Sequence, residues 1–148
     1  MGKPVFITLT VQANALYAID YPTGPQVDNC CTLSDDNNGS SGNGVIDNFQ
    51  SNVYANNTVT WSGVTADPNG VDRGYNIAIT QISNNSSFFP GNPLTGTPGR
   101  SGNVSATANG NIAGQNDTYT IYFTIYPPGN GTPKSAGLTI DPKLQGNN

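Results

Sequence analysis

Apolar residues recur at every second position in several short segments of the chain. In the first segment, Val5, Ile7, Leu9 and Val11 alternate with Phe6 and three polar residues. A period of two places alternate side chains on one face of a β-strand, so this segment is predicted to be a strand with one buried face. Comparable strands are expected at Thr58–Ser62, Tyr75–Ile82, Val104–Ala108, Thr118–Ile125 and Leu138–Ile140, and Ala15–Ile19 is expected to continue or pair beside the first.

Turn-forming sequences separate these segments, at Asp67–Gly70, Gly91–Pro93, Thr97–Gly99 and Pro127–Gly131. Their Pro, Gly and Asn residues favour fixed or positive φ angles. No apolar i, i+3, i+4 pattern persists long enough to predict a helix. The chain is therefore predicted to be all-β: a single-domain antiparallel β-sandwich of jelly-roll or Ig-like type, with about seven or eight strands and essentially no helix.

The predicted β-sandwich domain covers residues 1–142. It includes a long polar loop at about residues 20–51, which is rich in Pro, Gly, Asn, Asp and Ser and contains at most a short strand near Val45 and Ile46. Residues 143–148 are polar and follow Pro142, so they are expected to form a loose C-terminal tail.

The composition argues against most enzyme classes. Among 148 residues there is no histidine, and all nine acidic residues are aspartates. Histidine is the usual general base and transition-metal ligand, because its pKa lies near physiological pH. Without histidine, the many serines and threonines lack a partner that could activate them as nucleophiles. We therefore predict that the protein is not an enzyme.

The charge pattern excludes a nucleic-acid partner. Only 9% of the residues are charged, the formal net charge is −4 and there are five cations, too few for the basic patch that binds phosphates. No apolar run reaches the length of a membrane span, so membrane insertion is not expected. No signal peptide is seen, which favours a cytoplasmic protein; an extracellular location is expected instead if this is a mature or non-classically exported form.

Cys30 and Cys31 are adjacent in the predicted loop. Neighbouring cysteines cannot join distant segments, and a disulfide between them would close a strained ring. They are interpreted as two reduced thiols; the alternatives are a vicinal disulfide that acts as a rigid, apolar loop platform, or an intermolecular cross-link. Cys30 and Cys31 are the candidate redox residues of the chain.

The same loop contains a cluster of oxygen-bearing side chains that is compatible with calcium. Counted from Asp36, oxygens stand at the first, third and fifth positions, and Asp47 stands at the twelfth, as in a calcium-binding loop. Ser41, however, occupies the position that requires glycine in an EF-hand, and no flanking helices are expected. The two interpretations are a solvated polar loop and a looser calcium site. The candidate ligands are Asp35, Asp36, Asn38 and Asp47.

Aromatic residues suggest a second kind of site. Trp61 is in phase with Val59 on a predicted strand, which favours a position in the core over sugar stacking. Tyr122 and Tyr126 fall on the polar face of the strongest predicted strand, so together with Asn130 they are candidate ligand-binding residues. Asp67, Asp72 and Arg73 surround a predicted hairpin turn and are expected to form an exposed ion pair there.

Four segments resemble the bacterial inclusion-body protein family of the PixA and AidA type. They are Leu16-Tyr17 with Tyr21-Pro22, Asn57–Gly63, Asp117–Phe123 and Ile140–Leu144, and their order runs across nearly the whole chain. The last segment departs from the family, which has Trp-Asp-Pro where this chain has Ile140-Asp141-Pro142. The resemblance implies a cytosolic β-sandwich that accumulates or assembles, with no catalytic residues.

These observations predict a non-catalytic β-sandwich that self-assembles into a homo-oligomer or larger assembly, or that associates with another protein, because few charges keep its copies apart. The alternative is a soluble calcium-dependent lectin that binds glycans, with calcium as its possible cofactor.

Overall fold

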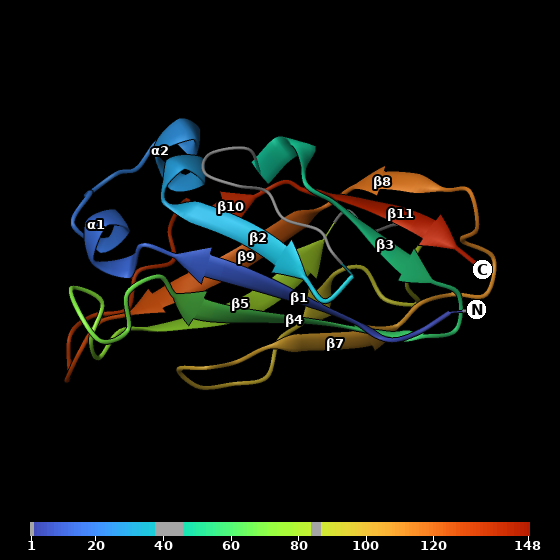
Figure 1. The fold of residues 1–148 in the computed structure, drawn as a ribbon. Helices are drawn as coiled ribbons and strands as arrows, with labels where there is room; N and C mark the ends of the chain where they lie inside the picture. Colours follow the sequence, from blue (N-terminus) through green and yellow to red (C-terminus); the bar gives the residue numbers. More distant parts are fainter. Residues whose placement is uncertain (1, 38–45, 84–86) are drawn as a thin grey trace.

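The computed structural model describes residues 2–37, 46–83 and 87–148. Its first sheet has the strand order β2-β1-β4-β7 (Figure 1). The strands are β1 (Val5–Val11), β2 (Cys31–Asp35), β4 (Thr58–Thr65) and β7 (Val104–Thr107). The alternation in β1 gives it one buried face, as predicted: Val5, Ile7, Leu9 and Val11 are all buried. β1 pairs with β2 antiparallel but with β4 parallel.

The second sheet has the order β10-β9-β5-β6 and the third has the order β3-β11-β8. Their strands are β5 (Asn76–Ser83), β6 (Leu94–Thr95), β9 (Thr120–Tyr126), β10 (Thr139–Ile140), β3 (Gln50–Tyr54), β8 (Asn116–Thr118) and β11 (Lys143–Asn147). β9 and β5 lie behind β1 and β4 in Figure 1. One buried hydrophobic cluster contains residues from all three sheets, so the sheets share a core.

Trp61 lies in this core, as its phase on the strand predicted. Its indole packs against Phe89, with ring centroids 5.4 Å apart, and against Tyr119 at 5.9 Å. The indole Nε1 donates a hydrogen bond to the Tyr119 hydroxyl at 3.0 Å, which satisfies the polar atom of each buried ring. Sugar stacking on Trp61 is excluded by its burial.

Two short α-helices differ from the expectation of essentially no helix. α1 (Ala13–Tyr17) forms where Ala15–Ile19 was expected to be extended. The carboxylate of Asp72 accepts a hydrogen bond from the Asn14 N–H at 2.8 Å, so a distant segment caps the beginning of this helix. α2 (Gly24–Asn29) begins at a local capping box, in which the Thr23 hydroxyl accepts from Gln26 N–H and the Gln26 side chain accepts from Thr23 N–H.

The all-β class is confirmed, because strands dominate and the α-helices are only two in the described part of the chain. The strand count was too low, since eleven strands are found among the described residues. The arrangement is not wholly antiparallel either, because β1 pairs parallel with β4 and β11 pairs parallel with β3. No helix among the described residues has the length and apolar character needed to cross a bilayer.

Two segments that were predicted to be irregular contain regular secondary structure. The expected polar loop at residues 20–51 contains α2, β2, a 3-10 helix (η1, Ile46–Asn48) and the start of β3. The expected loose tail is β11, the central strand of the third sheet, where it pairs with both β3 and β8. Neither β2 nor β11 was recognised, because each is only five residues long and is stabilised by partners distant in the sequence.

Candidate functional site

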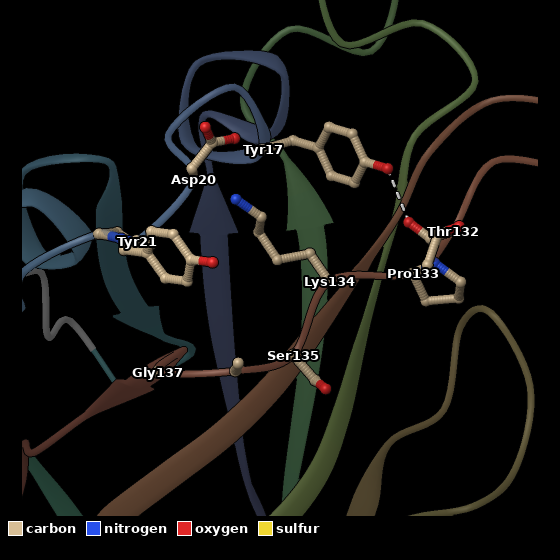
Figure 2. Close-up of a pocket in the computed structure, with 10 residues that line it drawn as sticks. Tyr17, Asp20, Tyr21, Thr132, Pro133, Lys134, Ser135 and Gly137 are labelled. Atoms are coloured by element: carbon tan, nitrogen blue, oxygen red, sulfur yellow. Dashed lines mark hydrogen bonds between the residues drawn. The ribbon is translucent and has the colours of Figure 1, made fainter.

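The structure contains a pocket of about 580 Å³ between the α1–α2 connection and the segment that precedes β10. One wall consists of Tyr17, Asp20, Tyr21 and Pro22, and the other of residues 132–137. Figure 2 shows the side chains of Tyr17, Asp20, Tyr21 and Lys134 around this space. The two walls are more than one hundred residues apart in the sequence, and Lys134 is held beside β9 by reciprocal backbone hydrogen bonds with Ile125.

Lys134 is the cation of this pocket, and its position is fixed by the opposite wall. Its Nζ donates a hydrogen bond to the Ile19 carbonyl and lies 5.6 Å from the centre of the Tyr17 ring, within the range of a cation–π interaction. Tyr17 is fixed in turn, because its hydroxyl donates to the Thr132 carbonyl at 2.7 Å and its ring meets Tyr75 edge-on at 5.9 Å. The ammonium group is therefore held in place before any ligand arrives.

Asp20 and Tyr21 form the exposed rim of the pocket. Tyr21 is 93% exposed, so its ring contributes little to the packing of the fold. Asp20 is exposed as well, and within residues 2–37, 46–83 and 87–148 its carboxylate has no hydrogen-bond or ion-pair partner. The pocket thus combines an immobilised donor, a free acceptor and an accessible aromatic face.

The predicted ligand-binding residues lie outside this pocket. Tyr122 is 36% exposed on β9, as its polar-face position predicted. Tyr126 is half-buried beneath the guanidinium of Arg100, whose carbon lies 5.4 Å from the ring centre. Asn130 is exposed in the turn after β9. None of the three lines the pocket, and their role in binding stays a prediction.

Arg100 instead connects the segment at the start of β5 with the segment at the end of β9. Its guanidinium donates to the carbonyls of Gly74 at 3.1 Å and Pro127 at 2.8 Å, and to the Asn76 side chain at 3.0 Å. It therefore holds the start of β5 and the end of β9 together, and the Tyr126 ring completes its surroundings.

The candidate calcium ligands are partly engaged in the fold. Asp35 accepts hydrogen bonds from the Ser51 hydroxyl and, at 2.8 Å, from Asn37 N–H. Asp36 accepts from Phe6 N–H at 3.1 Å. Asn38 and the Asp47 side chain lie outside the described residues. No group of three or more potential metal-binding His, Cys, Asp or Glu side chains occurs in the described part, and calcium binding stays a prediction.

Cys30 and Cys31 are free thiols in the structure. Cys30 is half-buried at the C-terminal end of α2, and Cys31 is buried as the first residue of β2. Burial raises the pKa of both thiols, and the neighbouring Cys30 and Asp28 raise that of Cys31 further. A raised pKa keeps a thiol protonated and unreactive, which fits a structural position for Cys31.

The turn around Asp67 and Asp72 was wrongly expected to be an exposed ion pair. Asp72 is only 2% exposed, and its carboxylate accepts from the backbone N–H groups of Asn14 at 2.8 Å and Asp67 at 2.9 Å. The guanidinium of Arg73 donates to the Asn69 carbonyl at 3.5 Å. Asp72 is therefore a buried anchor between this turn and α1.

Sequence reasoning missed the pocket, because no local motif joins Tyr21 to Lys134. The only signal was indirect: Leu16-Tyr17 and Tyr21-Pro22 were among the segments that resemble the inclusion-body protein family. Lys134 stands beside Pro133 in a polar stretch and carries no pattern of its own.

No protein-family model matches the sequence, and no curated protein matches it either. The structure is similar to the crystal structure of an inclusion body protein (PixA) from Burkholderia cenocepacia J2315. The TM-score is 0.66 at 12% sequence identity, over 99% of this chain and 96% of that chain. The resemblance to this family is thereby confirmed at the level of the fold.

Proposed function

We propose that this chain is a non-catalytic cytoplasmic protein that associates with copies of itself and accumulates in dense assemblies. The observation that carries the proposal is the fold, which an inclusion body protein shares over 99% of the chain. The match covers 96% of that inclusion body protein as well, so it concerns the whole fold and not one part of it.

The chemistry of the polar side chains supports a non-catalytic role. The chain has no histidine and no glutamate. Several of its aspartates act as structural acceptors: Asp72 binds backbone N–H groups, Asp35 binds Ser51, and Asp141 accepts from the Thr120 hydroxyl at 2.7 Å. Each of these carboxylates accepts hydrogen bonds that connect parts of the fold, which gives it a structural role.

The outer face of the third sheet is the surface we assign to self-association. We call it the amide face; it consists of Gln50, Asn52, Asn116, Thr118, Lys143, Gln145 and Asn147, which alternate with buried residues along β3 and β11. Asn116 donates to Gln50 at 3.0 Å and to Gln145 at 2.9 Å, which links the three strands. Lys143 is the one charged residue of this set.

A second copy of this chain suits the amide face, because a carboxamide both donates and accepts hydrogen bonds. Two such faces can therefore satisfy each other without a complementary set of charges. Removing amides from water is also less unfavourable than removing ions, which must be paired when they are buried. The low net charge of −4 adds little repulsion between the copies.

The proposal is tested by sedimentation velocity of the full chain over a range of concentrations. We expect the wild type to form larger species as its concentration rises. Asn52→Lys places a cation on the amide face and should shift association to at least tenfold higher concentration. Asn29→Lys adds the same charge at an exposed position on α2 and should associate like the wild type. Monomers at all concentrations, or equal effects of both variants, would contradict the proposal.

The calcium-dependent lectin is separated from this proposal by thermal melting. A ligand that binds only the native state raises the melting midpoint. Self-association predicts a midpoint that rises with protein concentration and is the same in excess calcium and in EDTA. A midpoint several degrees higher in calcium, and independent of protein concentration, would favour the lectin.

A further inference from the structure

The pocket between Tyr21 and Lys134 has the features of a ligand site that self-association does not require. Its volume of about 580 Å³ lies within the range of small-molecule sites. Four of its lining residues, Pro22, Pro133, Ala136 and Gly137, have no polar side-chain group, and the hydroxyl-bearing Thr132 and Ser135 line it as well. A few polar groups project into this apolar setting, an arrangement that orients a bound molecule (Figure 2).

Lys134 supplies hydrogen-bond donors to the pocket. An ammonium group has three N–H donors, and the Ile19 carbonyl accepts one of them. The Tyr17 ring holds the cation in place through its π face, which leaves N–H groups available to a ligand oxygen. Because the side chain is already held by the opposite wall, little conformational entropy is lost when a ligand binds.

Asp20 and Tyr21 supply the complementary chemistry on the rim. The Asp20 carboxylate accepts hydrogen bonds only, and no other group in the described residues uses it. The Tyr21 ring is 93% exposed, so a flat apolar surface of a ligand can stack on it without displacing a side chain.

These groups discriminate between ligand classes. Asp20 repels an anion and Lys134 repels a cation, and an apolar ligand would displace water from both charges without replacing its hydrogen bonds. A zwitterion such as an amino acid would depend on ion pairs at an exposed rim, where such pairs contribute little. A sugar fits all three features: adjacent hydroxyls accept from Lys134 and donate to Asp20, while the C–H face of the ring packs on Tyr21.

We propose that this pocket binds a neutral saccharide, as a monosaccharide or as the terminal residue of a glycan, without a metal ion. Tyr21 is the stacking platform, Lys134 the donor and Asp20 the acceptor. The site is separate from the amide face, so saccharide binding and self-association are independent properties of the chain.

The test is saturation-transfer-difference NMR of the full chain with the methyl glycosides of glucose, galactose, mannose, fucose and N-acetylglucosamine, at millimolar concentration. At least one glycoside should bind, equally well with and without EDTA. Tyr21→Ala should weaken binding at least tenfold, and Asp20→Asn and Lys134→Met should also weaken it. Phe6→Ala removes another exposed aromatic ring, outside the pocket, and should leave binding unchanged.

Three results would overturn the proposal: no glycoside binds, EDTA abolishes binding, or Tyr21→Ala and Asp20→Asn bind like the wild type. Tyr21 and Asp20 are exposed, so their variants remain informative even if Lys134→Met does not fold. The same variants should sediment like the wild type, which distinguishes failure of this site from failure of self-association.

Discussion

The indole of Trp61 donates a hydrogen bond to the hydroxyl of Tyr119 at 3.0 Å, and both side chains are buried. Trp61 is on β4 in the first sheet, and Tyr119 immediately precedes β9 in the second. The bond therefore joins two sheets through their shared core. It is inaccessible to water, so neither polar atom has an alternative partner there if the other is removed.

Removal of the Tyr119 hydroxyl should destabilise the fold. Tyr119→Phe leaves the Trp61 N–H buried without its acceptor, and we expect the free energy of unfolding to fall by about 1–3 kcal/mol. Urea unfolding followed by fluorescence measures this directly, since Trp61 is the single tryptophan of the chain. Tyr21→Phe removes an exposed hydroxyl and is the matched control. Equal stability of the two variants would show that the buried bond is not important.

Asp72 should be required for the start of α1. The two carboxylate oxygens of Asp72 accept hydrogen bonds from the backbone N–H groups of Asn14 and Asp67. Asp72→Asn replaces one of these oxygens with an NH₂ group, which cannot accept a hydrogen bond from an N–H donor. We expect a loss of about 1.5–3 kcal/mol in the free energy of unfolding, the range for hydrogen bonds to charged groups. Asp20→Asn removes the same charge at an exposed position and should change stability little. A wild-type melting midpoint for Asp72→Asn would contradict this assignment.

Gly146 allows a close backbone approach in the third sheet. A Cβ atom at this position would lie 2.0 Å from the Ile112 carbonyl oxygen, which is far inside contact distance. Gly146→Ala should therefore force the backbone to shift and lower the free energy of unfolding by about 1–3 kcal/mol. At Gly24 an added Cβ meets nothing within 4 Å, so Gly24→Ala should be neutral or slightly stabilising. Calorimetric melting of both variants tests the difference.

Stability should decrease at alkaline pH because of Cys31. Burial raises its pKa above the ordinary value of 9.0, so the native state keeps the proton after the unfolded chain has lost it. The unfolded state then binds fewer protons, and the free energy of unfolding falls as pH rises above about 9. Below that pH the protonated Cys31 thiol makes its full contribution to the free energy of unfolding. Burial also raises the pKa of the Tyr119 hydroxyl above its ordinary value of 10.0. This group therefore lowers the free energy of unfolding further as pH rises above about 10.

Urea unfolding at about pH 8 and about pH 10 measures this effect, on either side of the ordinary thiol pKa. Cys31→Ala should be less stable at both values, because it leaves a small cavity, but its stability should fall less between them. Cys30→Ala removes the half-buried thiol and should keep most of the fall. A fall in Cys31→Ala as large as in the wild type would assign the pH dependence to other groups.

The strands with strict alternation were predictable because their signal is local. In β1 the odd-numbered side chains are buried, as the period of two required. In β9 Ile121, Phe123 and Ile125 are buried as expected, but Thr120 and Thr124 on the expected polar face are buried as well. The phase of Trp61 with Val59 correctly placed the indole in the core. The outward position of Tyr122 followed from the same reasoning. A helix shorter than two turns gives no comparable periodicity, so α1 was not recognised.

The candidate site was less predictable. The carboxylates of the polar loop were predicted as calcium ligands because they lie close together in the sequence. In the structure, the Asp35 carboxylate accepts a hydrogen bond from the Ser51 hydroxyl of β3. The pocket depends on contacts between residues separated by more than one hundred positions, such as Lys134 with Ile19 and Tyr17 with Thr132. No local pattern encodes such a pair.

The sequence by itself determined the all-β class, through the two-residue period of half-buried strands. Its composition determined that histidine and glutamate side chains are absent and that few residues are charged. Only the tertiary structure decided that residues 143–147 form a central strand, that Asp72 caps α1, and that Tyr21 and Lys134 share a pocket. The physical reason is that these features are stabilised by hydrogen bonds and packing between distant segments, which exist only once the sheets have assembled around their common core.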